Sequence, residues 1–286
     1  MSAADRVASL RELGSLRRVE GRYDEAEGIL VRALALAEQM LGPDTLEVAD
    51  VANELGVVRK YAGRLDEAES AYRRALAIVE RHEGTQCADV ASIYHNLAGL
   101  GHARGDYAAA EPPARRGVEI RERAVGADHR DLVADKAALA AILDGAGKHC
   151  EAEVLLRQAL ARFERLFGAA HHEVAVNLNN LAAILHRRGE VSEACELYER
   201  ALAIKQARLG DAHPELAPTL ANLAALHASR GSIAAASACY SRAIAVLEPD
   251  VESDHPTLVA CREDFALLAG DDSAPYVDGG VRERRS

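Results

Sequence analysis

The sequence predicts an all-α solenoid built from about six two-helix units. Glycine recurs every 42 residues through five intervals, at Gly21, Gly63, Gly105, Gly147, Gly189 and Gly231. Between these glycines the apolar residues follow helical spacing, as Val174, Leu178, Leu181 and Leu185 do in the fifth unit. A single two-helix unit cannot bury its own apolar faces, so successive units are expected to stack in series.

Two further columns of the repeat hold the same register and predict the core. One is leucine, at Leu13, Leu55, Leu97, Leu139, Leu181 and Leu223, with Phe265 closing the series. The next position is small, at Gly14, Gly56, Ala98, Ala140, Ala182, Ala224 and Ala266. Small residues let neighbouring helices approach to about 8–10 Å, while larger side chains fill the remaining space.

Each unit is expected to contain helix A, a turn at the recurring glycine, and helix B. The glycine supplies the positive φ of a helix C′ position, and acids such as Asp24 and Glu25 open helix B, where the helix dipole favours negative charge. The A helices are expected near 5–20, 46–62, 88–104, 130–146, 172–188 and 214–230. The B helices are expected near 24–41, 66–82, 107–125, 150–167, 192–209 and 234–249.

Some repeats depart from the pattern. Pro112 and Pro113 should delay or kink the third helix B, and Pro218 should bend the first turn of the sixth helix A. The alanine-rich fourth unit is the weakest repeat and is either a flexure point or simple sequence drift.

A last helix at about 256–269 is expected to cap a solenoid that covers residues 1–269. Residues 270–286 lack apolar periodicity and are expected to form a flexible tail.

Composition excludes several classes of protein. The chain has 286 residues, of which 49% are hydrophobic, and a net charge of −11, which argues against nucleic acid as a partner. Its apolar runs are far shorter than the roughly 20 residues of a membrane span, and the charged N-terminus does not resemble a secretory signal. Five scattered cysteines without a CxxC motif fit reduced thiols. We therefore expect a cytoplasmic protein without membrane partners.

Two stretches carry a resemblance to a known family. GRYDEAEGILVRALALAEQMLGPD and NNLAAILHRRGEVSEACELYERALAIKQARLGDAHP resemble tetratricopeptide repeats (TPRs). The 42-residue period, the LG-x-x-HP turn and the NLA motif resemble the kinesin-light-chain subtype, and the resemblance covers about residues 5–269. It implies a right-handed superhelix whose concave surface, lined by the A helices, binds peptides or partner proteins. The resemblance does not name the ligand.

Helix geometry selects candidate residues for that concave groove. If Leu181 and Ala182 face the neighbouring helix, the open side carries a set of polar residues that recurs from unit to unit. This set comprises Asn53, Lys60, His95, Asn96, His102, Asn179, Asn180, His186, Arg187 and Asn222. In related repeats, asparagines in the column of Asn96, Asn180 and Asn222 hydrogen-bond an extended peptide, and a carboxamide offers both a donor and an acceptor. The alternative is that these asparagines bond the adjacent helix A.

Histidines are the only other candidates for chemistry. His129, His171, His213 and His255 form one column of the inter-repeat turn. Successive copies should lie roughly 16–20 Å apart, whereas zinc ligands lie about 2.0–2.3 Å from the metal, so we expect caps or turn packing. His95 and His102 are seven residues apart on one helix face and are the only pair we would test for acid–base work. We expect no catalytic residue, metal or cofactor.

The sequence therefore favours a non-catalytic scaffold or adaptor that binds a peptide or partner protein in the concave groove. One alternative is a repurposed solenoid that binds or transforms a small molecule in its interior. Another is a peptide-responsive regulator that acts on another protein. An open channel with an asparagine ladder would favour the peptide, and a closed pocket around His95 and His102 would favour the small molecule. Homo-oligomerisation stays open.

Overall fold

The computed structural model describes residues 2–249 and 255–270 of the chain. These residues fall into two compact units, one ending at Lys148 and the other beginning at His149. The boundary lies in the turn of the fourth repeat, whose sequence matches the repeat pattern least well. Most of the predicted tail, residues 271–286, lies outside the described part of the chain.

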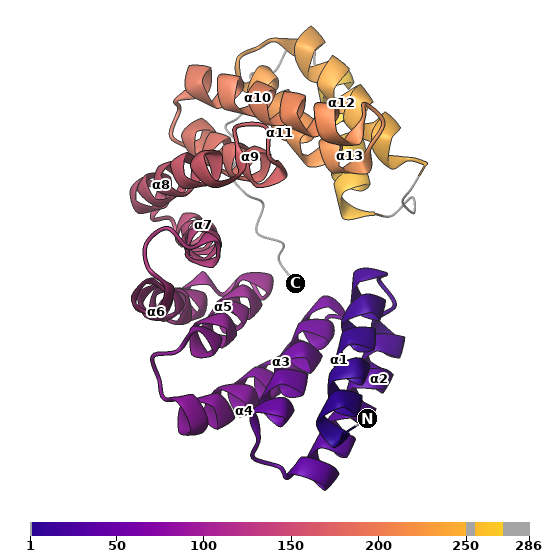
Figure 1. Ribbon diagram of the computed structural model, residues 1–286. Helices are drawn as coiled ribbons and strands as arrows, with labels where there is room; N and C mark the ends of the chain where they lie inside the picture. Colours follow the sequence, from indigo (N-terminus) through magenta and orange to yellow (C-terminus); the bar gives the residue numbers. More distant parts are fainter. Residues whose placement is uncertain (1, 250–254, 271–286) are drawn as a thin grey trace. The chain divides into compact units, whose positions relative to one another are not determined.

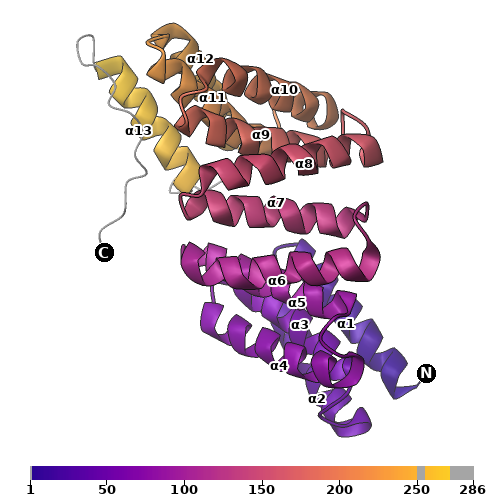
Figure 2. The same cartoon turned by 90° about the vertical axis from the view of Figure 1, so that its left-hand side faces the viewer.

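The first unit consists of alternating A and B helices. Its A helices are α1 (Ala3–Val19), α3 (Leu46–Tyr61), α5 (Ala88–Ala103) and α7 (Arg130–Gly145). Its B helices are α2 (Tyr23–Leu41), α4 (Leu65–Glu83) and α6 (Tyr107–Val125). Each A helix also contacts the next A helix along the chain. Within this unit α3 and α5 lie on one side, and α4 and α6 lie on the other (Figures 1 and 2).

The second unit continues the same alternation. It contains α8 (His149–Phe167), α9 (His172–Arg187), α10 (Val191–Leu209), the short 3₁₀ helix η1 (Pro214–Leu216), α11 (Ala217–Ser229), α12 (Ile233–Leu247) and α13 (Pro256–Gly270). Helix α13 packs against α11 and α12 and matches the predicted closing helix. The described residues contain helices and no strand, which confirms the predicted all-α repeat fold.

Glycine ends the helices for a conformational reason. The six glycines of the predicted column have φ between 70° and 79°, a region that side chains with a Cβ rarely adopt. After α3, for example, the Arg64 N–H donates to the Arg59 carbonyl at 2.8 Å, which closes a Schellman-type turn around Gly63. A second 42-residue series, at Gly42, Gly84, Gly126, Gly168 and Gly210, ends the B helices with φ between 80° and 102°.

Three of the four histidines in the predicted column cap A helices, whereas the buried Nδ1 of His255 has no hydrogen-bond partner among the described residues. The Nδ1 atoms of His129, His171 and His213 accept hydrogen bonds from backbone N–H groups two residues further on, at 3.2–3.3 Å. Thr45 takes the same role in its own repeat, with Oγ1 accepting from the Val48 N–H at 3.4 Å. These side chains satisfy donors that a helix N-terminus leaves without a partner.

The two predictions made from the prolines have different outcomes. The predicted delay of the third helix B is wrong, because α6 begins at Tyr107 and matches α2 and α4 in length despite Pro112 and Pro113. Asp106 fixes its start, since its carboxylate accepts from the Ala109 N–H at 3.0 Å. The predicted distortion near Pro218 is confirmed, because the sixth helix A opens as the 3₁₀ turn η1 before α11 begins.

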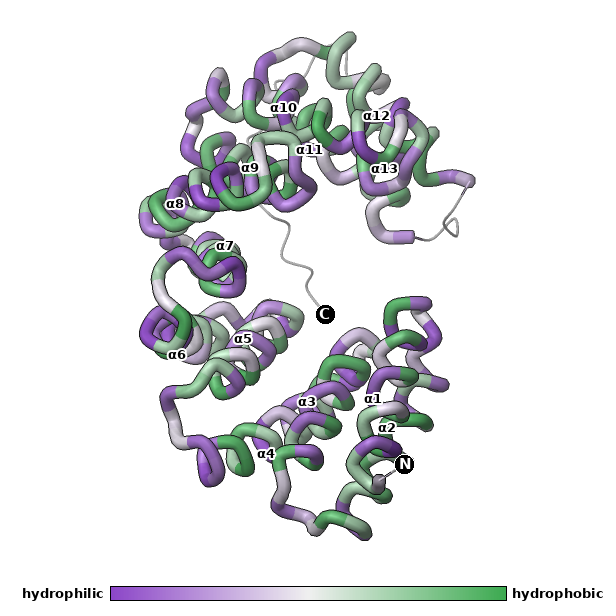
Figure 3. The backbone as a smooth tube through the Cα atoms, in the orientation of Figure 1, coloured by the Kyte–Doolittle hydropathy of each residue, from purple (hydrophilic) through white to green (hydrophobic). Residues whose placement is uncertain are grey.

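In the first two hairpins, a glycine of helix A faces a large residue of helix B. A Cβ at Gly56 would lie 2.6 Å from the Tyr72 ring, and one at Gly14 would lie 2.7 Å from the Leu30 side chain. Tyr72 and Leu30 are completely buried. Hydrophobic and hydrophilic residues alternate along the turns of each helix (Figure 3). In the described part of the chain, no helix combines the length and the apolar content needed to cross a membrane.

We expect Gly101→Ala to lower the free energy of unfolding by about 1–3 kcal/mol. The new Cβ would lie 2.7 Å from the Ala110 Cβ and 2.9 Å from its Cα, so α5 and α6 would have to separate. Gly99→Ala on the same helix is the control, since its Cβ would meet only the Lys60 Nζ, at 3.5 Å. This control should be neutral or slightly stabilising because alanine favours helix. Urea unfolding measures both variants, and equal effects would contradict the packing assigned to Gly101.

Candidate functional site

Two pairs of asparagines link successive A helices. In the first unit the Asn96 Nδ2 on α5 donates to the Asn53 Oδ1 on α3 at 2.9 Å. In the second unit the Asn222 Nδ2 on α11 donates to the Asn179 Oδ1 on α9 at 3.3 Å. Each bond joins residues 43 positions apart, so the same geometry recurs in both units. All four side chains are half-buried.

These bonds bear on the two roles that the sequence left open for the asparagine column. Asn96 and Asn222 do bond the adjacent helix A, which was the alternative to ligand contact. An asparagine pair carries four N–H groups and two carbonyl oxygens, and the bond between them uses one of each. Donors and acceptors therefore remain for a ligand, and the two roles are compatible.

Ion pairs join the first two A helices. The Arg11 Nη1 on α1 lies 2.6 Å from the Asp50 Oδ2 on α3. One turn further along, Glu54 accepts from the Ser15 Oγ at 2.6 Å and from the Arg18 Nε at 3.0 Å. Burial raises the pKa of the Asp50 carboxyl above its ordinary value, although Arg11 acts in the opposite direction. This face of α1 and α3 is therefore already neutralised within the chain.

Lys60 is a cation without an acidic partner in the described part of the chain. Its Nζ lies 5.0 Å from the centre of the Tyr61 ring, a cation–π distance, and the side chain is half-buried. Burial lowers the pKa of Lys60, and the neighbouring Arg18 lowers it further. Among residues 2–249 and 255–270, no carboxylate forms an ion pair with Lys60. Tyr61 is 55% exposed and stacks on Tyr23 at 6.1 Å between ring centres.

A buried charge network joins α5, α6 and α7. The His95 Nδ1 lies 2.8 Å from the Asp135 Oδ1, and the Arg121 Nε donates to the Asp135 Oδ2 at 2.8 Å. Arg121 also donates to the Ala88 carbonyl and to the Ser92 Oγ. The side chains of Arg121 and Asp135 are 7% and 6% exposed, whereas that of His95 is 42% exposed. The buried Asp135 therefore holds the His95 ring in place, while the rest of that ring is partly exposed at the surface.

The two histidines considered for acid–base chemistry have different neighbours. His95 contacts Asp135, whereas the exposed ring of His102 meets the edge of Tyr107 at 5.5 Å between ring centres. In the described ranges, no group of three or more His, Cys, Asp or Glu residues is placed to hold a metal ion.

The second unit positions the remaining candidate residues. The His186 Nε2 on α9 lies 3.3 Å from the Ser229 Oγ on α11, which gives these two A helices a second link beside the Asn179–Asn222 pair. Asn180 is half-buried on α9, and Arg187 is exposed at the C-terminal end of the same helix.

Sequence reasoning missed the buried polar residues behind this surface. Asp135 stands in the column of the buried Val51 and Ile93, and Arg121 stands in the column of Val79. Lys205 interrupts the same column as Arg121, is 6% exposed, and donates to the Glu215 carbonyl at 3.2 Å. Burial lowers the pKa of Lys205. For Arg121 and Lys205, a charge in an otherwise apolar column was the signal that could have identified them. The column of Asp135 also holds the polar Asn177 and Thr219, so it gave no such signal.

Comparison with known proteins places these repeats in a family. One profile described as tetratricopeptide repeat matches residues 5–81 and 173–248, and a second with the same description matches 90–131 and 137–173. No significant match is found among curated proteins.

Solved structures share the fold. A Podosopora anserina kinesin-light-chain-like protein with nearly identical TPR-like repeats is 23% identical, with a TM-score of 0.62 over 73% of this chain and 98% of that one. BtubC (BKLC) from P. vanneervenii is 25% identical, with a TM-score of 0.60 over 100% of both chains. A STAND signal-transduction ATPase with a tetratricopeptide repeat sensor from Pyrococcus horikoshii is 14% identical, with a TM-score of 0.67 over 93% of this chain and 39% of that one.

Proposed function

Because the chain belongs to the tetratricopeptide repeat family, whose fold is generally a protein-interaction scaffold, we propose that it is a non-catalytic adaptor that binds a partner protein through an extended segment. The segment lies along the exposed faces of the A helices. Each of the two compact units carries one candidate patch for such a segment. The first comprises Asn53, Lys60, His95, Asn96 and His102, and the second comprises Asn179, Asn180, His186, Arg187 and Asn222.

The recurrence of the asparagine pair carries this proposal. A pair of linked carboxamides is held in place by its own bond and still offers N–H groups and carbonyl oxygens to a peptide backbone. Such hydrogen bonds are made to the peptide backbone and not to its side chains, so they suit an extended segment of variable sequence. Each contributes only about 0.5–1.5 kcal/mol, so several must act together.

Neighbouring side chains add selectivity in the first patch. The Lys60 ammonium has no carboxylate partner in the described chain, so an acidic group of the partner can supply one. The exposed Tyr61 ring beside it offers apolar contact area. Asp135 engages the Nδ1 of His95, so Nε2 is the ring nitrogen available to a bound partner. Together these groups favour a segment that carries an acid near an apolar residue.

A binding role fits these contacts better than a catalytic one. His95 contacts Asp135 and His102 contacts Tyr107, so the two histidines do not converge on one substrate position.

We also propose that the adaptor works in the cytoplasm. All five cysteines are free thiols, which supports a reducing compartment.

Replacing Asn96, Asn180 and Asn222 together with alanine should weaken partner capture by about 10- to 1000-fold, the equivalent of three lost hydrogen bonds of the usual strength. Peptides selected on the full chain from a displayed random library provide the probe, and fluorescence anisotropy measures their Kd. Gln39→Ala removes an exposed carboxamide from helix B and should leave the Kd unchanged. The proposal is wrong if the triple variant, with intact helical circular dichroism, binds as tightly as the original chain.

A further inference from the structure

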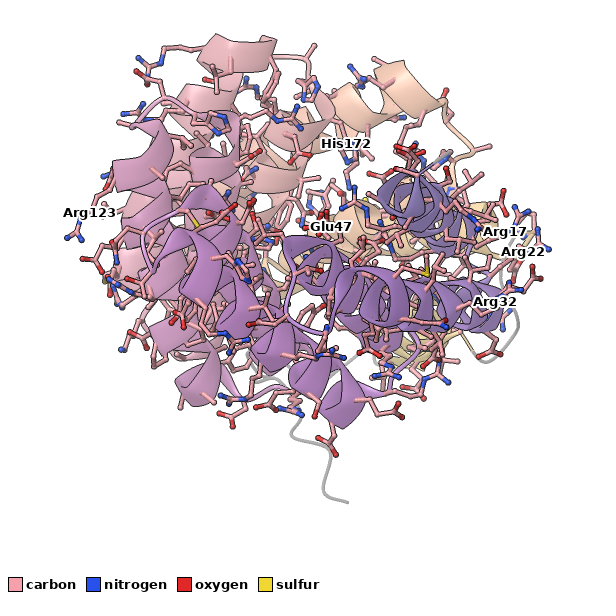
Figure 4. All side chains as sticks on the ribbon, turned by 60° about the horizontal axis from the view of Figure 1, so that its bottom comes forward. Arg17, Arg22, Arg32, Glu47, Arg123 and His172 are labelled. Atoms are coloured by element: carbon pink, nitrogen blue, oxygen red, sulfur yellow. The ribbon has the colours of Figure 1, made fainter. Side chains whose placement is uncertain are left out.

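The half-buried Lys60 differs from cations of the first unit that have acidic partners. Arg22 and Arg123 project from the outer surface of this unit (Figure 4), and they pair with Glu25 and Glu119 respectively. Among the described residues, the Lys60 ammonium forms no such pair. Because a charge that is partly removed from water is stabilised by a partner, a negative group of a bound molecule would fit beside it.

The Lys60 ammonium lies over a position of α5 that has no side chain. A Cβ at Gly99 would lie 3.5 Å from the Lys60 Nζ, and apart from the adjacent residues of the chain no other described side chain comes within 4 Å of that point. The equivalent positions of the other A helices all carry a side chain, and they are Ser15, Val57, Ala141, Ala183 and Ala225. Gly99 therefore leaves room for a small group beside the ammonium.

Two histidines flank this room along α5. His95 precedes Gly99 by four residues and His102 follows it by three. Residues at these separations lie on one face of a helix, with about 5–6 Å between Cβ positions. Of the two, His95 is the one that contacts a carboxylate, since its Nδ1 lies 2.8 Å from the Asp135 Oδ1.

Asp135 determines which nitrogen of His95 carries the hydrogen in the free chain. Its carboxylate accepts from the Arg121 Nε, so it is also an acceptor toward the His95 Nδ1. Neutral His95 then donates from Nδ1 and carries a lone pair at Nε2. A carboxylate that arrives at Nε2 would face this lone pair, so Nε2 can donate to it only after taking up a proton.

The charges around His95 act on that proton in opposite directions. Asp135 on α7 stabilises a protonated ring, whereas Arg121 on α6 and Lys60 on α3 oppose it. Other acids on the neighbouring helices have cationic partners, which are Arg11 for Asp50, Arg18 for Glu54 and Lys136 for Glu122. Asp89, near the start of α5, lies toward Asp50. A carboxylate bound to Lys60 would offset the opposing charge and favour the protonated ring.

We propose that one Asp or Glu side chain of the bound segment places its carboxylate over Gly99, between Lys60 and His95, and that its capture adds a proton to His95. One oxygen accepts from the Lys60 Nζ and the other from the protonated Nε2 of His95. The proton comes from the solvent. The subsite depends on the proposed peptide-binding role, to which it adds the position of the acid and a dependence on pH.

The affinity for an acidic segment should therefore fall as the pH rises. Binding that takes up one proton changes Kd by at most about tenfold per pH unit. Histidine side chains generally change charge near neutral pH, whereas an aspartate or glutamate of a peptide stays ionised above about pH 6. The pH dependence thus reports on a histidine and not on the ligand.

Peptides selected on the full chain from a displayed random library at about pH 6 provide the probe. We expect them to share one Asp or Glu, and we expect Kd measured by fluorescence anisotropy to rise about tenfold between about pH 6 and pH 8. Replacing that residue of the peptide with Asn or Gln should weaken binding at the lower pH and remove most of the pH dependence. His95→Gln should remove it as well, whereas His102→Gln should keep it.

Isothermal titration calorimetry of the unaltered chain counts the protons directly in two buffers of different ionisation enthalpy. We expect net proton uptake with the acidic peptide and none with its amide variant. A Kd that does not change with pH, or a pH dependence that persists in His95→Gln, would overturn the subsite and leave the adaptor role standing. A Lys60→Gln variant that keeps the full preference for the acidic peptide would overturn its placement over Gly99. Failure to select any peptide would overturn both the subsite and the adaptor role.

Discussion

Replacing Asp135 with alanine should lower the free energy of unfolding by about 3–5 kcal/mol, the usual cost of breaking a buried ion pair. The substitution leaves Arg121, whose side chain is 7% exposed, without its carboxylate in the interior of the first unit. It also removes the acceptor that holds His95. Urea unfolding followed by circular dichroism measures the loss.

Two controls separate this effect from a general loss of charge. Glu119→Ala removes an exposed carboxylate that pairs with Arg116 and Arg123 on the helix surface, and it should change stability little. The double variant Arg121→Met with Asp135→Leu replaces both charges by apolar side chains and should recover most of the stability. An Asp135→Ala variant no less stable than Glu119→Ala would contradict the buried network.

Leu181→Ala should destabilise the second unit by about 2–5 kcal/mol, because it removes most of a completely buried side chain from the core. The same repeat position supplies its control. Leu13 is 38% exposed, so Leu13→Ala should have an effect within about 1 kcal/mol. Thermal unfolding compares the two variants, and equal shifts would show that the leucine column does not mark the core.

The repeat made the fold and most of the core predictable. Residues 42 positions apart stand in nearly the same surroundings, so the leucine column and the small column identified buried positions in most units, although Leu13 is 38% exposed. The turn glycines could be predicted because the positive φ that they adopt nearly requires glycine. The delay expected from Pro112 and Pro113 failed because Asp106 already fixes the start of α6.

The candidate site was harder to predict, since its contacts run between repeats. Sequence columns suggested that Asn53 and Asn96 face the same side, but the bond between them joins different columns, 43 residues apart. That offset depends on how far each A helix is rotated and shifted against the next, which the repeat period does not specify. The network of His95, Arg121 and Asp135 could not be predicted for the same reason, because its members come from three successive helices.

The first described repeat shows a limit of reasoning from repeat columns. Leu16 has the same sequence signature as Val58 and Leu100, yet only Leu16 is exposed. A column records which residues would be buried if a neighbour were present, and it does not report whether the neighbour exists.

Amide hydrogen exchange of the full chain, with and without a peptide selected on it, tests the proposed binding role most directly. The account predicts that the bound peptide slows exchange in the A helices that carry the asparagine pairs, α3 and α5 or α9 and α11, and that replacing Asn96, Asn180 and Asn222 with alanine abolishes this protection. Protection confined to the B helices, or protection that persists unchanged in the triple variant, would contradict it.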